Sequence, residues 1–220
     1  MNRVELPGWL TPLVDLAGTI QPADLMPLVP LQAQDEGVGE TRGAAVLLLF
    51  WQDGPEDGPG DTRVLLIQRA AEMRSHAGQP AFPGGAIDPT DLDASAAAVR
   101  EAVEETGLDP AGVEVFATLP DLSVPVSGFT VTPVLAWWRD PSPVAPADRN
   151  EVASVHQVRI ADLVDPVNRL IARHISGRQS PAFEVDGILV WGFTAFVLDR
   201  VLALAGWELP WSQDRVMDIS

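Results

Sequence analysis

The chain contains no cysteine, no lysine and no tyrosine among its 220 residues. Without cysteine it cannot form disulfides, a thiolate nucleophile or a cysteine-based zinc site. Without lysine it cannot form a Schiff base or use a P-loop lysine, and its 14 basic residues are all arginine. General acid–base chemistry is therefore left to aspartate, glutamate and three histidines.

Positive charge is scarce, and the formal net charge is -17 at pH 7. Binding to nucleic acid depends on basic patches that neutralise phosphates, so this balance argues against a nucleic-acid partner. The negative electrostatic field of such a protein also repels a polyanionic small molecule. A phosphorylated substrate would need metal ions and local arginines to overcome that repulsion.

Long hydrophobic runs are also missing. Residues 1–8 lack the apolar core of a signal peptide, and the longest apolar run, 187–198, is too short to span a bilayer. We therefore expect a soluble, cytoplasmic protein with no membrane partner. Residues 1–40 are proline-rich and acidic and are predicted to form an extension packed on a domain of residues 41–220, and their apolar positions suggest a homodimer.

Strands interleaved with a few helices predict a mixed α/β layered domain. Apolar, β-branched runs predict strands at 43–51, 63–68, 113–118, 129–138, 152–158 and 182–191. Helical spacing of apolar residues predicts helices at 10–16, 22–25, 160–163, 167–175 and 193–204. A further helix is expected to start after Asp91 or Asp93, either of which can cap it, and to stop at Gly107.

This last helix carries Glu101, Glu104 and Glu105 directly behind the glycine pair Gly84-Gly85. At about 100° per residue the three carboxylates fall within roughly an 80° sector, so they are expected to share an outward face. Like charges at this spacing weaken a helix, and a divalent cation would remove the penalty. Clustered carboxylate oxygens suit Mg²⁺ or Mn²⁺ better than zinc.

The segment from Gly85 to Leu108 resembles the Nudix box, the signature of hydrolases that split a nucleoside diphosphate linked to another group. Its second half, 100–108, matches the family pattern except that Ala102 fills an apolar position. In the first half Asp91 stands where a glutamate is expected, and eight residues rather than seven separate it from Arg100. The role of Asp91 is left open by this spacing.

Two flanking stretches are similar to the coenzyme A diphosphatase subfamily. These are 65–69 with 73–85, which precede the box, and the Trp-Gly-x-Thr-Ala element beginning at Trp191. The resemblance implies a Nudix fold, with a central mixed sheet between helices and a loop–helix–loop box. It implies hydrolysis of coenzyme A or its thioesters to 3′,5′-ADP and a 4′-phosphopantetheine product.

The resemblance also implies roles for individual residues. Glu101 and Glu105 would bind the metal, Glu104 would bind it or act as the base, and a carbonyl of Gly85 is a further ligand. Arg100 would orient a glutamate through a bidentate contact. From their place just before the glycine loop, the residues expected to meet phosphate or ribose groups of the substrate are Arg69, Arg74, His76 and Gln79. The alternatives are salt bridges to the chain's many acids for Arg69 and a structural hydrogen bond for His76.

Other readings stay open on the sequence alone. Glu151, which opens a strand, could supply an extra acid at the site, and Trp137 and Trp138 could border a pocket. The box does not distinguish coenzyme A from ADP-ribose, dinucleotides or nucleoside diphosphate sugars. A nucleotide-binding module without catalysis is a second alternative, although such modules often lose the box carboxylates that this chain retains.

Overall fold

The Nudix-like segment starts in a strand of the larger of two sheets, and its helix packs against the same sheet. In the computed structural model, which describes residues 6–25, 42–53, 58–71, 77–124 and 128–219, the central strands of this sheet run in the order β3-β2-β1-β7-β5. β4 also pairs with β1, β6 with β7 and β8 with β2. The bounds are β1 (Arg42–Gln52), β2 (Thr62–Arg69), β3 (Pro80–Ala81), β4 (Gly84–Ala86), β5 (Val113–Thr118), β6 (Leu122–Val124), β7 (Phe129–Trp138) and β8 (Val152–Arg159).

The sheet is mixed because β1 runs parallel to β7 and antiparallel to β2 and β4. β1 and β2 are buried over most of their length, which fits their nearly continuous apolar sequences. The predicted strands at 43–51, 63–68, 113–118, 129–138 and 152–158 are all present. The mixed α/β fold class is confirmed.

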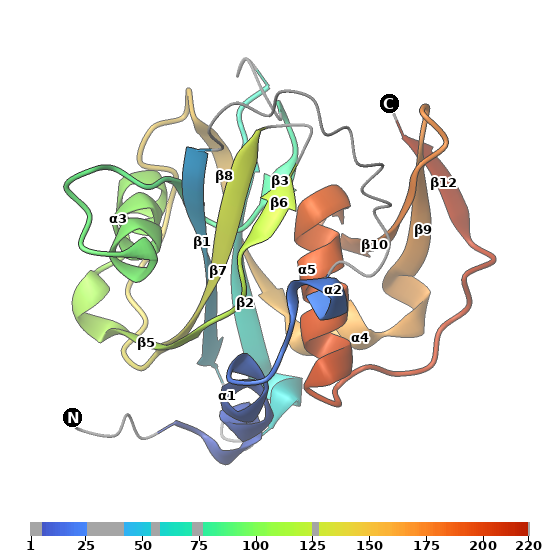
Figure 1. Cartoon of the computed structure of the whole chain (residues 1–220). Helices are drawn as coiled ribbons and strands as arrows, with labels where there is room; N and C mark the ends of the chain where they lie inside the picture. The colour runs from blue at the N-terminus through green and yellow to red at the C-terminus, as the bar shows by residue number, and fades with distance from the viewer. Residues whose placement is uncertain (1–5, 26–41, 54–57, 72–76, 125–127, 220) are drawn as a thin grey trace.

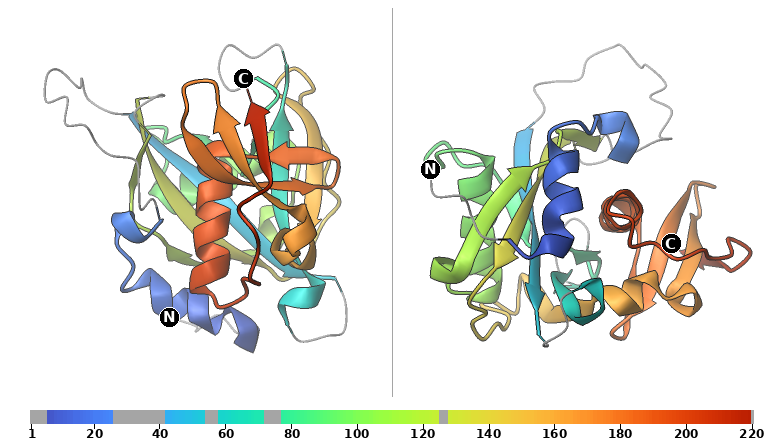
Figure 2. Two further views of the ribbon diagram at one scale, coloured as in Figure 1. Left: turned by 90° about the vertical axis from the view of Figure 1, so that its right-hand side faces the viewer. Right: turned by 90° about the horizontal axis from the view of Figure 1, so that it is seen from below.

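A second sheet lies beyond the C-terminal helix and has the order β11-β10-β9-β12 (Figures 1 and 2). Its strands are β9 (Arg169–His174), β10 (Gln179–Val185), β11 (Ile188–Val190) and β12 (Val216–Ile219). The helix predicted at 167–175 is wrong, because that stretch contains β9. The single strand predicted at 182–191 is a hairpin, since Asp186 and Gly187 turn the chain between β10 and β11.

Helices lie on both sides of the main sheet (Figures 1 and 2). α3 (Ala94–Thr106) covers one face, while α1 (Thr11–Ala17) and α5 (Gly192–Leu204) lie on the other. The remaining helices are α2 (Pro22–Leu25), α4 (Ile160–Val164) and the 3₁₀ turns η1 (Gly8–Leu10), η2 (Pro59–Asp61), η3 (Pro110–Gly112) and η4 (Pro166–Asn168). In the part of the chain that the structure describes, no helix is long and apolar enough to cross a membrane.

The described residues of the N-terminal extension contribute to the main core. Leu10, Leu13 and Leu25 are buried in the same cluster as the central strands. α1 contacts α5 and β5, and α2 contacts α5. Full burial of each leucine stabilises the fold by about 1.5–3 kcal/mol relative to exposure. The boundary at residue 40 stays a prediction, because residues 26–41 lie outside the described part.

Two tryptophans predicted as possible pocket borders are core residues instead. Trp138 is 1% exposed and packs edge-on against Trp51, and Trp137 is 9% exposed and packs against Trp9. Adjacent residues of β7 are both covered because one face of the sheet carries α3 and the other carries the N-terminal helices. These indoles stabilise the core and do not line a pocket.

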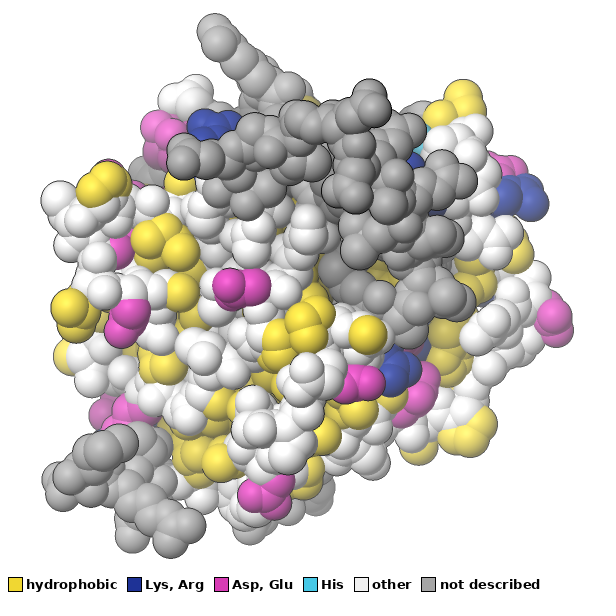
Figure 3. Space-filling view, in the orientation of Figure 1, with side chains coloured by type: hydrophobic (Ala, Val, Ile, Leu, Met, Phe, Trp, Pro, Cys, Tyr) yellow, Lys and Arg dark blue, Asp and Glu magenta, His cyan; other side chains and the backbone are white. Residues whose placement is uncertain are grey.

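The distribution of acidic side chains on the surface reflects the acidic composition of the chain. Acidic side chains are scattered over the face shown in Figure 3 and do not gather in one patch. Negative charge is therefore a general property of that face, whereas the candidate site depends on a local arrangement of acids and arginines.

Candidate active site

Local sequence fixes where α3 begins and ends. The Asp93 side chain caps the helix by accepting a hydrogen bond from the backbone N–H of Ala96. Gly107 ends it in the left-handed region with a φ of 68°. The predicted limits of the box helix are thus confirmed, and Asp93, not Asp91, is its cap.

The buried face of α3 consists mainly of small residues. Ala97, Ala98 and Ala102 are fully buried and let the helix approach β1 closely. The predicted outward-facing glutamate cluster is wrong for one member. Glu104 is exposed, but Glu105 is only 8% exposed because its face of the helix turns toward the glycine loop.

Glu105 is the most perturbed carboxyl group of the site. Its Oε2 accepts a hydrogen bond from the backbone N–H of Gly84 at 2.9 Å, and its Oε1 lies 3.8 Å from Nη1 of Arg69. Burial raises the pKa of Glu105 to about 7, and the nearby Glu101 and Glu151 carboxylates add to the increase. The Gly84 hydrogen bond and Arg69 oppose it without cancelling it.

Glycine is required at positions 84 and 85 because neighbouring atoms of the protein lie too close for a Cβ atom. A Cβ on Gly85 would lie 2.5 Å from the carboxyl carbon of Glu101, and a Cβ on Gly84 would lie 2.3 Å from the carbonyl oxygen of Ala45. Gly84 also has a φ of 154°. Glycine at both positions lets the loop lie between β1 and the carboxylates of α3.

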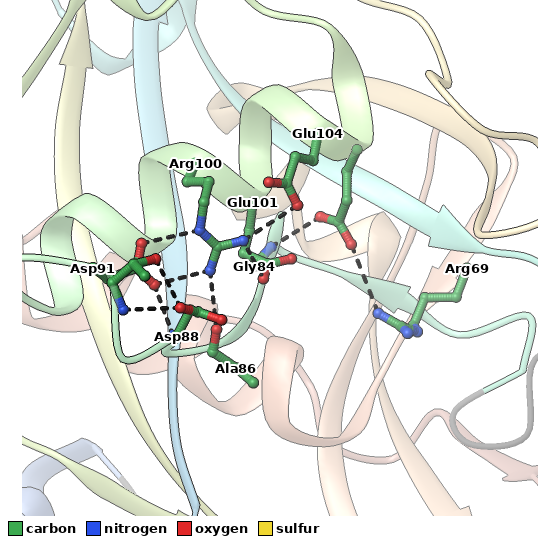
Figure 4. A network of polar contacts seen from close by, with 10 residues as sticks. Arg69, Gly84, Ala86, Asp88, Asp91, Arg100, Glu101 and Glu104 are labelled. Carbon is green, nitrogen blue, oxygen red and sulfur yellow. Dashed lines mark hydrogen bonds and ion pairs between the residues drawn. The ribbon is translucent and has the colours of Figure 1, made fainter.

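Arg100 organises the acidic loop (Figure 4). Its Nε and Nη2 donate to the two carboxylate oxygens of Asp91 at 3.0 and 2.9 Å. Its Nη1 donates to Glu101 at 2.8 Å and to Glu104 at 3.2 Å, and Nη2 also reaches the Ala86 carbonyl oxygen at 3.1 Å. The predicted bidentate contact to a glutamate is wrong, because the bidentate partner is Asp91.

This pairing gives Asp91 a role that the sequence left open. The Arg100 hydrogen bonds lower the pKa of Asp91 and, with the neighbouring glutamates, raise the pKa of Arg100. Asp88 supports the loop, since its backbone N–H donates to Asp91 and its carboxylate accepts from Thr90. The Asp-x-x-Asp spacing is a turn signal from which this loop could have been anticipated.

Three of the other predicted site residues can be placed relative to Glu105. Arg69 and Glu151 are near Glu105, as their electrostatic effects on it show. Gln79 is joined to Arg69 through the backbone, because its carbonyl oxygen accepts the Arg69 N–H at 3.1 Å. Arg74 and His76 lie outside the described residues.

The donor set fits a hard divalent cation. Glutamate oxygens and a glycine backbone meet here, and Glu105 is buried with incomplete compensation of its charge. Among the described residues, however, no three His, Asp or Glu side chains converge as a ready-made metal site. Arg100 lies between Glu101 and Glu104 and holds both carboxylates (Figure 4).

Comparisons with known proteins show what this chain is similar to. The family model for the NUDIX domain matches residues 41–178. An uncharacterized Nudix hydrolase NudL from Cronobacter sakazakii is 39% identical over 174 residues, covering 77% of this chain and 85% of that protein. The Escherichia coli NudL, also described as uncharacterized, is 39% identical over 168 residues, with coverage of 74% and 82%.

Solved structures share the fold. A Nudix hydrolase from M. smegmatis, RenU, superposes with a TM-score of 0.51 at 24% identity, covering 76% of this chain and 86% of that one. A NUDIX hydrolase from Alicyclobacillus acidocaldarius gives a TM-score of 0.50 at 19% identity, covering 77% and 93%. At these identities the likeness concerns the fold alone.

Proposed function

The chain belongs to the Nudix hydrolase family, and on that premise we propose that it hydrolyses the diphosphate of coenzyme A or its thioesters with Mg²⁺ or Mn²⁺. The observation that carries the proposed chemistry is the buried Glu105 carboxyl, held by the Gly84 N–H beside Arg69. A buried acid with a pKa near 7 suits a site that takes up a cation.

Each residue of the site has a proposed task. Glu101, Glu105 and the Gly85 carbonyl would hold the cation. Glu104, the most exposed of the three glutamates, would complete the ligand set or accept a proton from the attacking water. A bound Mg²⁺ or Mn²⁺ supplies charge neutralisation at phosphoryl oxygens and makes its bound water more acidic.

The arginines would offset the negative charge of the carboxylates and of the substrate phosphates. Arg100 fixes the loop through Asp91 and keeps the like-charged Glu101 and Glu104 in place. Arg69 lies close enough to Glu105 to meet a phosphate bound there, and Gln79 would contact the substrate nearby. Glu151 adds negative charge close to Glu105 and is proposed as an extra acid. Arg74 and His76 stay predicted substrate contacts.

Support for coenzyme A comes from two separated stretches that share the subfamily pattern. Thr194, from the Trp-Gly-x-Thr-Ala element, is 5% exposed and donates its hydroxyl to the Pro80 carbonyl oxygen at 3.2 Å. The two elements therefore meet beside the glycine loop although 114 residues separate these positions. An interaction between them is expected if both serve one substrate.

A panel of diphosphates tests the substrate. We expect the highest kcat/KM on coenzyme A or an acyl derivative, with 3′,5′-ADP as a product, and lower values on ADP-ribose, diadenosine polyphosphates and nucleoside diphosphate sugars. Equal or faster turnover of ADP-ribose would overturn the coenzyme A assignment while leaving the diphosphatase assignment intact. Reaction in ¹⁸O-labelled water would show which phosphorus is attacked.

Proton release provides a test of Glu105 as a metal ligand. A carboxyl with a pKa of about 7 is mostly protonated near pH 6 and mostly ionised near pH 8, and it must lose its proton to bind a cation. We expect Mg²⁺ binding to release about one proton per site near pH 6 and almost none near pH 8. Calorimetry in buffers of different ionisation enthalpy measures this, and pH-independent release would contradict it.

Arg100→Lys tests the loop anchor. Lysine keeps the positive charge but cannot reproduce the fork that binds Asp91 while also reaching Glu101. We expect kcat/KM to fall by about tenfold. The matched control is Arg139→Lys, since Arg139 is half exposed and pairs with Glu114. Equal activity of the two variants would remove Arg100 from the account.

A further inference from the structure

A chain of polar side chains connects the second sheet to the segment that leads into the glycine loop. It begins at Asp186, whose Oδ2 lies 2.7 Å from Nδ1 of His156. Nε2 of His156 lies 2.7 Å from the Ser154 hydroxyl, which is 3.3 Å from Oε1 of Gln68. The Gln68 amide nitrogen then donates to the Gly78 carbonyl oxygen at 3.2 Å.

Strand register brings these residues together. Ser154 lies opposite Gln68, and His156 opposite Leu66, in the antiparallel pair of β2 and β8. Alternation along a strand puts Ser154 and His156 on the same face. Asp186 occupies the turn of the β10–β11 hairpin with a φ of 51°, followed by Gly187 with a φ of 75°, a conformation that Asp-Gly favours.

This series of side-chain contacts ends at the segment Gly78–Pro80, which is held by several hydrogen bonds. Besides the Gln68 contact to Gly78, the Arg69 N–H binds the Gln79 carbonyl oxygen and the Thr194 hydroxyl binds the Pro80 carbonyl oxygen. Arg69 follows Gln68 directly, and its Nη1 lies 3.8 Å from Oε1 of Glu105. A displacement of this segment would therefore move Gln79 relative to Arg69.

The order Ser–His–Asp is also that of a nucleophilic triad, but the surroundings favour a different role. Ser154 lies in the middle of a strand, and its hydroxyl faces the Gln68 side chain directly across the sheet. The same hydroxyl is the only bridge that the described contacts show between His156 and Gln68. In this position the Ser154 hydroxyl is better placed to orient the Gln68 side chain than to attack a substrate.

We propose that Asp186, His156, Ser154 and Gln68 are positioning residues that hold the Gly78–Pro80 segment, and with it Gln79, in the geometry that binds the substrate. The inference rests on the proposed function and extends it to four residues that do not touch the metal-binding glutamates in any described contact. Loss of a link weakens substrate binding and leaves the chemical step and metal affinity unchanged.

Ser154→Ala tests the proposal in the full chain with coenzyme A as substrate. Loss of one link in a partly buried network should raise KM about five- to tenfold, with kcat within about twofold of the wild type. Ser154→Thr keeps the hydroxyl and should restore KM. The matched control is Ser176→Ala, because Ser176 forms an exposed hydrogen bond with His174 at 2.9 Å on a different turn. Its kinetics should be unchanged.

Several outcomes would overturn the proposal. An unchanged KM in Ser154→Ala, a fall in kcat alone, or failure of threonine to restore KM would each do so. If Ser154→Ala does not fold, Asp186→Asn decides: it keeps a residue suited to the turn but removes the charge facing His156, and KM should rise about threefold.

A binding measurement separates this proposal from the proposed function. The probe is a methylene-bridged ADP, which cannot be cleaved, titrated into the wild type and Ser154→Ala with Mg²⁺ present. If the wild type hydrolyses no diphosphate, the proposed function fails, and weaker analogue binding by Ser154→Ala still supports the positioning role. Equal affinities of the two proteins, or no binding by either, overturn it.

Discussion

We expect Glu105→Gln to lower kcat for diphosphate hydrolysis by at least about a hundredfold. Glutamine has the same size and keeps an oxygen that can accept the Gly84 N–H, so the loop should stay in place. What it lacks is the negative charge that would hold a cation. Glu104→Gln should cause a loss of similar size if Glu104 binds the metal or acts as the base.

The fold provides a control for this substitution. Glu184→Gln makes the same chemical change on the second sheet, where Glu184 is half exposed and pairs with Arg215. It should leave kcat within about twofold of the wild type. Steady-state kinetics at saturating Mg²⁺ make the comparison. Glu105→Gln and Glu104→Gln variants that both turn over at the wild-type rate would exclude these carboxylates from the mechanism.

The largest expected loss of stability comes from Arg169→Met. The Arg169 side chain is fully buried and pairs with Asp199 of α5 and with Glu208. Its guanidinium carbon lies over the rings of Phe183 and Trp211, 4.8 and 4.3 Å from their centroids. Methionine leaves two carboxylates without their cation in a partly desolvated place. We expect the free energy of unfolding to fall by about 3 kcal/mol, as measured by urea denaturation.

Arg173→Met is the matched control because it lies on the same strand. Arg173 forms a bidentate pair with Asp218, but both side chains are largely exposed, so the expected loss is below about 1 kcal/mol. Burial already raises the pKa of Asp199. The Arg169→Met defect should therefore shrink at acidic pH, where Asp199 becomes protonated, and an equal loss in both variants would contradict this account.

The sequence predicted best where local signals dominate. Asp93 and Gly107 mark the ends of α3, and the continuous apolar runs of β1 and β2 identify buried strands. Capping and left-handed glycine depend on a few neighbouring residues, so they can be recognised without knowing the fold. The same signals placed the acidic residues directly behind the glycine loop.

Tertiary packing overrode local pattern in the second sheet. Val167, Leu170, Ile171 and Ile175 have helical spacing, yet Val167 and Ile175 are 68% and 86% exposed. The buried residue at the start of β9 is Arg169, which a hydrophobic pattern assigns to the surface. Its partners Asp199 and Glu208 come from later parts of the chain. These long-range ion pairs do not show in the local spacing of apolar residues.

The site was predictable in composition but not in geometry. Helical spacing anticipated that Glu101 and Glu104 lie together, and Arg100 pairs with both, whereas the burial of Glu105 depends on how α3 is rotated against β1 and the glycine loop. The bidentate pairing of Arg100 with Asp91 joins α3 to a loop that is one residue longer than the family pattern. Neither follows from spacing alone.

The central claim is that the carboxylates of α3 bind a divalent cation beside a diphosphate. The most direct test is Mn²⁺ binding by the purified protein, measured by electron paramagnetic resonance with methylene-bridged ADP present. The account predicts Mn²⁺ uptake by the wild type that is weakened at least about tenfold in Glu101→Gln and Glu105→Gln. Absence of Mn²⁺ uptake by the wild type, or uptake unaffected by both substitutions, would contradict it.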